Sequence, residues 1–130
     1  MHHDTTILAP VSAGELIDKI TILRIKVERI TDARKVALAR AELNQLSLIA
    51  DRHVTFTDDI YEFADELQAV NERLWDIEDE IRKKEHAREF DDTFIALARA
   101  VYINNDERAT IKRKLNEALG SQIVEVKQYA

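Results

Sequence analysis

The sequence predicts a mainly α fold, an antiparallel bundle of four long helices. Apolar residues recur at alternating spacings of three and four, which is the period of a helix with one buried face. The 130 residues include only two glycines and one proline, so few positions break a helix. Polar residues that cap helix N-termini precede each periodic stretch.

The first expected elements are an extended arm and a capped helix. Residues 1–11 lack periodicity, and Pro10 disfavours a helical conformation in the residue before it. Ser12 and Glu15 have the spacing of a capping box, so a first helix is expected over about 13–30.

This first helix is apolar on two faces. A main stripe runs along one side, while Ile22 and Ile25 point to nearly the opposite side. A helix of this kind is buried on two sides, either centrally in the fold or at a subunit contact. The second possibility predicts a homodimer, and the alternative to it is that the chain's own terminal arms cover Ile22 and Ile25.

Thr31-Asp32 is expected to separate the first helix from a second over about 33–53. The short connection predicts an αα-hairpin. Thr57 is expected to cap a third helix that ends near residue 86. That helix has the most regular apolar seam: Ile60, Phe63, Leu67, Val70, Leu74, Ile77 and Ile81.

A fourth helix is expected over about 93–119, capped by Asp91 or Asp92. Asn104-Asn105-Asp106 compete for backbone hydrogen bonds, so this last helix is predicted to be kinked or broken there. Gly120 is expected at the C′ position that ends it.

The whole chain, residues 1–130, is expected to form a single helical domain, with an arm (1–11), a bundle (12–120) and an extended tail (121–130). The tail contains the β-branched residues Ile123, Val124 and Val126. An extended tail could pair with the Thr5–Val11 arm as a small β-ribbon.

Composition excludes several classes of function. The chain has no cysteine, so disulfides, thiolate nucleophiles and cysteine-based metal sites are ruled out. The residues three positions before His53 and His86 are Ala50 and Lys83, not the glutamates of a di-metal helix motif. No glycine-rich phosphate loop is present either. The sequence therefore predicts no metal and no cofactor.

Charge and hydropathy bear on partners and location. Between Asp58 and Glu80, 10 acidic residues face one basic residue, Arg73, within a chain of net charge −6. Such a surface repels phosphate backbones, so no nucleic acid partner is expected. No signal peptide or apolar run of transmembrane length is apparent, which predicts a cytoplasmic protein without membrane contact.

A candidate binding site emerges from polar residues that share helix faces. On the third expected helix, four of them lie at i, i+4, i+7 and i+11, and analogous positions follow on the fourth and first helices. If these lines converge, they enclose a ligand site; otherwise they form interhelical salt bridges or the rim of a homodimer contact. The candidates are Asn71, Trp75, Glu78 and Arg82, then Arg99, Tyr102 and Asp106, then Asp18 and Arg29.

Three segments resemble a family of short bacterial proteins known only as a domain of unknown function. The likeness spans nearly the whole chain and implies a bacterial protein, but it implies no activity and no catalytic residues. The segments that resemble it are Pro10-Val11-Ser12 with Gly14-Glu15-Leu16-Ile17-Asp18-Lys19-Ile20-Thr21-Ile22-Leu23, Val70-Asn71-Glu72 with Leu74-Trp75 and Ile77-Glu78-Asp79, and Ala98-Arg99-Ala100-Val101-Tyr102 with Asn105-Asp106.

One enzyme comparison is a minor alternative. Ile17-Asp18, the aliphatic residues after it and Arg29 are similar to the opening helix of the all-helical chorismate mutases. That resemblance implies an enzyme that stabilises a transition state through cationic contacts to two carboxylates. However, Glu28 stands where that family's arginine is expected, and the acidic third helix opposes a dianionic substrate.

The sequence therefore favours a non-enzymatic interaction or scaffold protein. It is expected to form a homodimer and to bind a further protein partner whose identity is unknown. The rival is a protein that binds a small anion or carboxylate in a polar pocket between helices. An open pocket would favour the rival, and mutually paired charges would favour the scaffold.

Overall fold

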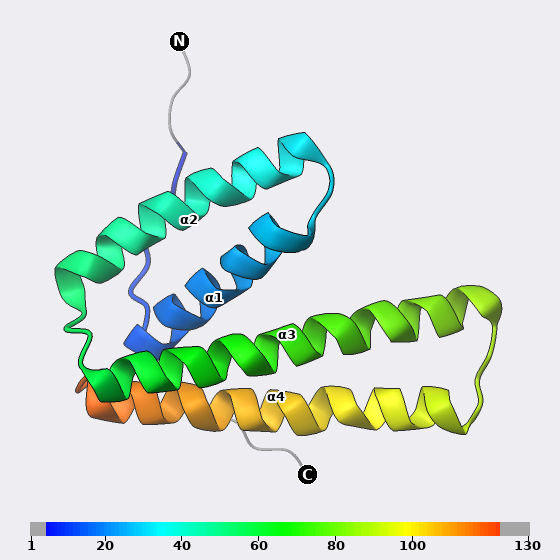
Figure 1. Ribbon diagram of the computed structural model, residues 1–130. Helices are drawn as coiled ribbons and strands as arrows, with labels where there is room; N and C mark the ends of the chain where they lie inside the picture. The colour runs from blue at the N-terminus through cyan, green and yellow to red at the C-terminus, as the bar shows by residue number, and fades with distance from the viewer. Residues whose placement is uncertain (1–4, 123–130) are drawn as a thin grey trace.

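Four helices make up the computed structural model, which describes residues 5–122 (Figure 1). The mainly α class is therefore confirmed, and each helix begins and ends within about two residues of its expected bounds. The helices are α1 (Ala13–Arg29), α2 (Ala33–His53), α3 (Asp58–Ala87) and α4 (Asp92–Ala118).

Each helix begins at a predicted cap whose side-chain oxygen accepts a hydrogen bond from a backbone amide three residues on. This bond satisfies one of the amides that a helix N-terminus leaves unpaired. The cap-to-amide distances are 3.1 Å for Ser12 to Glu15, 3.0 Å for Asp32 to Lys35, 3.4 Å for Thr57 to Ile60 and 2.9 Å for Asp91 to Phe94.

The C-terminus of α4 is also as predicted. Gly120 has a φ of 66°, the left-handed conformation that glycine adopts without strain. The Ser121 amide then donates to the Asn116 carbonyl at 2.8 Å, which satisfies one of the last carbonyls of the helix.

The helices form two hairpins, α1 with α2 and α3 with α4, and α1 lies between α2 and the second hairpin. α2 packs against α1, and α1 in turn lies on the pair formed by α3 and α4 (Figure 1). Among the described helices, α2 makes no close backbone contact with α3 or α4. The two apolar faces of α1 are thus explained by its central position: Ile25 is only 1% exposed within the single chain. A subunit contact is therefore not needed to bury Ile25, whereas Ile22 is only half-buried.

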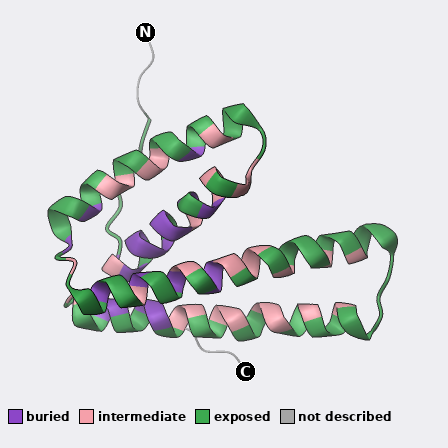
Figure 2. Ribbon diagram, viewed as in Figure 1, coloured by how far each residue is buried: buried purple, intermediate pink, exposed green. Residues whose placement is uncertain are grey.

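Burial is concentrated at one end of the molecule (Figure 2). The main core joins Ile17 of α1 to α3 and α4, and a smaller cluster joins α1 to α2. In contrast, not one of residues 72–107 is buried. We call this stretch, the far half of α3 and α4 with their connection, the distal hairpin.

α4 corrects one expectation. It is an uninterrupted helix, so the break predicted at Asn104-Asn105-Asp106 is wrong. The side-chain amide of Asn104 donates through Nδ2 to the Ala100 carbonyl at 2.8 Å, and its Oδ1 accepts from Arg73 Nε at 3.1 Å. Since this side chain finds partners that leave the helix in place, it does not end the helix.

The terminal segments are tested only in part. Residues 5–11 form neither helix nor strand, and Ile7 and Leu8 are 88% and 92% exposed. The predicted β-ribbon also needs residues 123–130, which lie outside the described residues, so this pairing stays a prediction. No helix within 5–122 is both long and apolar enough to span a membrane.

Candidate functional site

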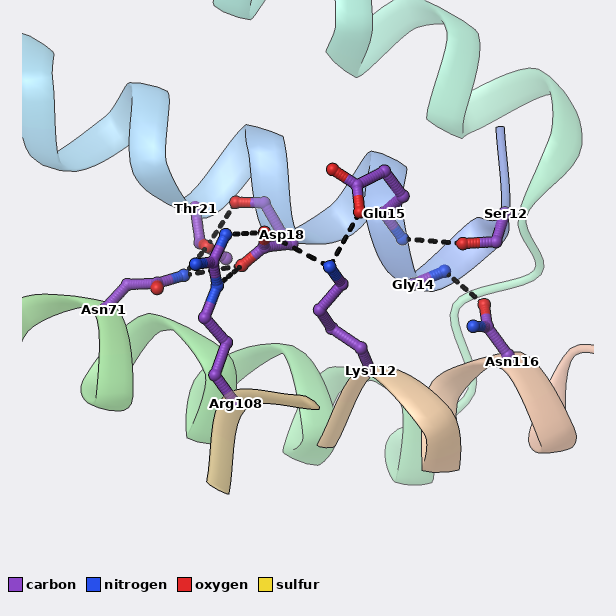
Figure 3. Close-up of polar contacts among 9 residues, drawn as sticks. All are labelled: Ser12, Gly14, Glu15, Asp18, Thr21, Asn71, Arg108, Lys112 and Asn116. Atoms are coloured by element: carbon purple, nitrogen blue, oxygen red, sulfur yellow. Dashed lines mark hydrogen bonds and ion pairs between the residues drawn. The ribbon is translucent and has the colours of Figure 1, made fainter. Parts of the chain in front are cut away.

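A buried carboxylate lies at the junction of α1, α3 and α4 (Figure 3). Asp18 is 1% exposed. Its Oδ1 accepts from Arg108 Nε and from Asn71 Nδ2, each at 2.9 Å, and its Oδ2 accepts from the second arm of the Arg108 guanidinium. A carboxylate removed from water is tolerated when it is paired and hydrogen-bonded in this way.

Asn71 and Thr21 complete the surroundings of Asp18. Asn71 Nδ2 is 2.9 Å from Thr21 Oγ1, and the Thr21 hydroxyl donates to the Asp18 carbonyl at 2.7 Å. α1 and α3 are thereby joined through polar groups as well as apolar ones. Such a fully paired network holds its side chains in one arrangement.

α4 continues this contact along α1 with one residue in every turn. Lys112 Nζ donates to Glu15 at 2.7 Å and lies 3.9 Å from Asp18 Oδ2. Asn116 accepts from the Gly14 amide at 2.6 Å. A Cβ on Gly14 would be 2.6 Å from the Lys112 carbonyl oxygen, so only glycine allows the two helices to come this close.

An open groove of about 480 Å³ lies between the two hairpins, next to Arg108. α1 contributes the apolar side chains of Ile22 and Ile25, and α3 contributes the half-buried Trp75. Both charge signs are present. The lining residues are Ile22, Ile25, Asn71, Leu74, Trp75, Glu78, Asp79, Arg82, Asn105 and Arg108.

The charges along the α3 side of the groove are weakly paired. Arg82 Nε is 3.9 Å from Glu78, and their side chains are 75% and 49% exposed. Arg29 of α1 pairs with Asp76 of α3, and neither residue lines the groove. The groove therefore offers both charges to a ligand above an apolar floor.

Of the three predicted polar lines, only the one on the third helix lines the groove completely. All four candidates of the third helix, Asn71, Trp75, Glu78 and Arg82, line it. Asp18 lies beneath it, occupied by Arg108.

The predicted line on the fourth helix lies beside the groove. Arg99, Tyr102 and Asp106 are exposed and are not lining residues. Arg99 donates to the Tyr102 hydroxyl at 3.4 Å, and this hydrogen bond raises the pKa of the guanidinium. The α4 residues that do line the groove, Asn105 and Arg108, were missed.

A signal for Arg108 exists in the sequence. Arg108, Lys112 and Asn116 recur every fourth residue, which marks a polar stripe on one face of α4. The three facing positions on α1, Gly14, Glu15 and Asp18, belong to one turn. Within residues 5–122, no three His, Asp or Glu side chains gather as a metal site.

Comparison with known proteins identifies the family without an activity. No curated protein and no solved structure matches the chain. A model of a protein family, described as a family of unknown function (DUF6165), matches residues 7–130. The chain therefore belongs to this family of unknown function, DUF6165.

Proposed function

We propose that this protein is a non-enzymatic interaction protein whose binding surface is the groove between the two hairpins. One observation carries the proposal: an open groove with a half-buried tryptophan lies directly beside a buried, fully paired polar cluster. Trp75 combines a large apolar area with one N–H donor, a combination enriched at interfaces. The cluster keeps the walls of the groove rigid.

The charges of the groove add little to folding. The Glu78–Arg82 pair is long and largely exposed, and such pairs contribute roughly 0–1 kcal/mol. Their value to the protein is therefore better explained by a bound partner than by stability. The same reasoning does not apply to Asp18 and Arg108, which are engaged with each other.

The second candidate is a small carboxylate ligand in the same groove. It is favoured by the open groove and by the exposed Arg82 guanidinium, a planar fork that matches a carboxylate, next to the apolar floor. The interaction protein is placed first because the charged candidates of α1 are paired, Asp18 with Arg108 and Arg29 with Asp76. A chorismate-mutase-like activity is disfavoured. A dianion would face Glu78 and Asp79, and the Arg108 guanidinium already holds Asp18.

Affinity capture with a matched pair of variants tests the interaction. Trp75→Ala removes the apolar anchor of the groove, while Leu48→Ala truncates a 60% exposed side chain on α2 as the control. We expect at least one bound species, which includes a differently tagged copy of this chain, to be lost with Trp75→Ala and kept with Leu48→Ala. If every species survives Trp75→Ala, the groove is not the binding surface.

The small-ligand candidate is tested by fluorescence, because Trp75 is the only tryptophan. Octanoate carries a carboxylate on an apolar chain, octanol lacks the charge and octylamine reverses it. Saturable change in Trp75 emission with octanoate, weakened about tenfold by Arg82→Ala, would support carboxylate binding. An equal response to all three compounds would mean that the groove does not recognise the charge.

A further inference from the structure

We infer that the partner is a second copy of this chain, and that two distal hairpins pack face to face with α3 antiparallel to the partner's α3. The inference rests on the proposed function, since it fills the same binding surface. It is carried by three features of the described residues: the uncovered hairpin, one stripe of side chains on each of its two helices and the order of its charges.

The distal hairpin is only two helices thick. Arg29, the last residue of α1, pairs with Asp76, and no residue from 72 to 107 is buried. Figure 2 shows this half of α3 and α4 without the buried residues of the other half. Isolated helices of about 15 residues are marginal in water and gain most of their stability by packing against other elements. A further layer packed on this hairpin would therefore stabilise it.

One face of this hairpin has the residues of an interface. On α4, Ile95, Ala98 and Tyr102 lie on a stripe that continues to the groove residue Asn105, at i, i+3, i+7 and i+10. Ile95 is 54% exposed and Tyr102 53% exposed.

On α3, the matching stripe is Trp75, Glu78 and Arg82, which begins inside the groove. We call the two stripes without Asn105 the distal face, which consists of Ile95, Ala98, Tyr102, Trp75, Glu78 and Arg82. Aromatic and apolar side chains with a few charges on two adjacent helices are typical of an interface between helical layers.

The order of charges selects a symmetric partner. Glu78 precedes Arg82 by four residues, so two antiparallel copies of α3 place each Glu78 opposite the other copy's Arg82. Both ion pairs form at once when the twofold axis passes beside Glu80. Within one chain the same two side chains remain 3.9 Å apart and exposed.

The length of the uncovered helix places the axis at the same position. The part of α3 without buried residues runs from Glu72 to Ala87, and its midpoint also falls beside Glu80. An antiparallel copy would then cover this entire stretch, about 24 Å of helix. The contact is self-complementary, so it closes as a dimer and does not extend into a fibre.

Charge exchange with sedimentation equilibrium tests this arrangement. The native chain is expected to show a monomer–dimer equilibrium. Arg82→Glu places four like charges around the axis and should raise the dissociation constant at least about tenfold. The exchange Glu78→Arg with Arg82→Glu restores both pairs and should return the dissociation constant to within about threefold of the original.

Lys83→Glu is the matched control, since it makes the same charge change one residue along. Lys83 pairs with Glu80 at 3.1 Å and lies about 100° around the helix from Arg82, off the distal face. Its dimerisation should be unchanged, and circular dichroism should show all variants folded. A native chain that is monomeric at about 100 μM, or an Arg82→Glu variant that dimerises normally, would overturn the inference.

The two proposals fail in different ways. A monomeric protein whose Trp75-dependent capture finds a different molecule would retain the groove as a binding surface and remove the second copy as its occupant. A dimer unaffected by Arg82→Glu and by Trp75→Ala would remove both. The exchange also re-forms the ion pair within each helix. Restoration therefore supports the antiparallel register when urea unfolding shows that Arg82→Glu leaves the stability of the monomer unchanged.

Discussion

Asp18 and Arg108 illustrate how a single contact can join elements far apart in the chain. The two residues are 90 positions apart, and their pairing fastens α4 to α1 beside the groove. The sequence placed Asp18 among polar residues expected to form a ligand site, interhelical salt bridges or the rim of a homodimer contact, without naming its partner. Its actual partner could not be predicted, because the rotation of α4 about its axis depends on contacts with α1 and α3. A change of one residue turns a helix face by about 100°.

Arg108→Ala should be strongly destabilising, because it leaves a carboxylate of 1% exposure without its main partner. Breaking a buried pair costs roughly 3–5 kcal/mol, and Lys112 at 3.9 Å from the same carboxylate should keep the loss near the lower value. Urea unfolding measures the free energy directly.

Arg73→Ala is the control for that measurement. Arg73 also bridges helices, to Glu107 at 3.0 Å, but the two side chains are 49% and 54% exposed. Its loss should cost no more than about 1 kcal/mol. If both variants lose the same free energy of unfolding, the burial of Asp18 does not make the loss of Arg108 more costly.

At the scale of elements, helix ends were predictable, but the neighbours that each helix face contacts were not. A cap depends on residues three positions apart, such as Asp91 and Phe94, so local sequence is sufficient to predict it. The break expected at Asn104 failed because Arg73, from another helix, supplies a partner that the local sequence does not reveal. For the same reason the α4 line was placed on Tyr102 instead of Asn105.

The stability that Asp91 contributes at the connection between α3 and α4 should depend on pH. Asp91 accepts from Lys84 Nζ at 2.9 Å as well as capping α4, and the Lys84 hydrogen bond lowers the pKa of the Asp91 carboxyl below its usual 3.8. A pKa lower in the folded chain means that Asp91 stabilises fully above its unfolded pKa. That contribution is lost as the pH falls through the folded value.

Asp91→Asn isolates this effect, because asparagine still caps the helix but carries no charge. Between pH 7 and about pH 3, the native chain should lose more stability than Asp91→Asn in urea titrations. Asp92→Asn removes a neighbouring exposed carboxylate and should behave as the native chain does. Parallel curves for the native chain and Asp91→Asn would rule out the contribution of Lys84.

At the scale of the whole molecule, the fold is a hairpin laid across one end of a longer hairpin. The sequence predicted four helices and a bundle, because periodicity shows which residues each helix buries. It did not predict that α2 packs on α1 while half of α3 and α4 stays uncovered. The apolar seam of Leu74, Ile77 and Ile81 is as regular as that of Ile60, Leu67 and Val70, yet the first three are only half-buried and the last three are buried. Periodicity reports a helix face but not the number of layers that cover it.

Hydrogen exchange should reveal this division. Amides near Leu67 and Leu115, both 0% exposed, should exchange only through global unfolding, since their helices are held by the core. Amides between residues 72 and 107 should exchange through local opening, at least about tenfold faster in dilute protein. Mass spectrometry of the peptides at about 1 μM and about 100 μM then adds the effect of association. If the distal hairpins pair, the protection of 72–107 should rise with concentration while that around Leu67 and Leu115 changes much less. Uniform protection along α3 in dilute protein would show that the two-helix half is stable by itself, and the physical reason for a second copy would disappear.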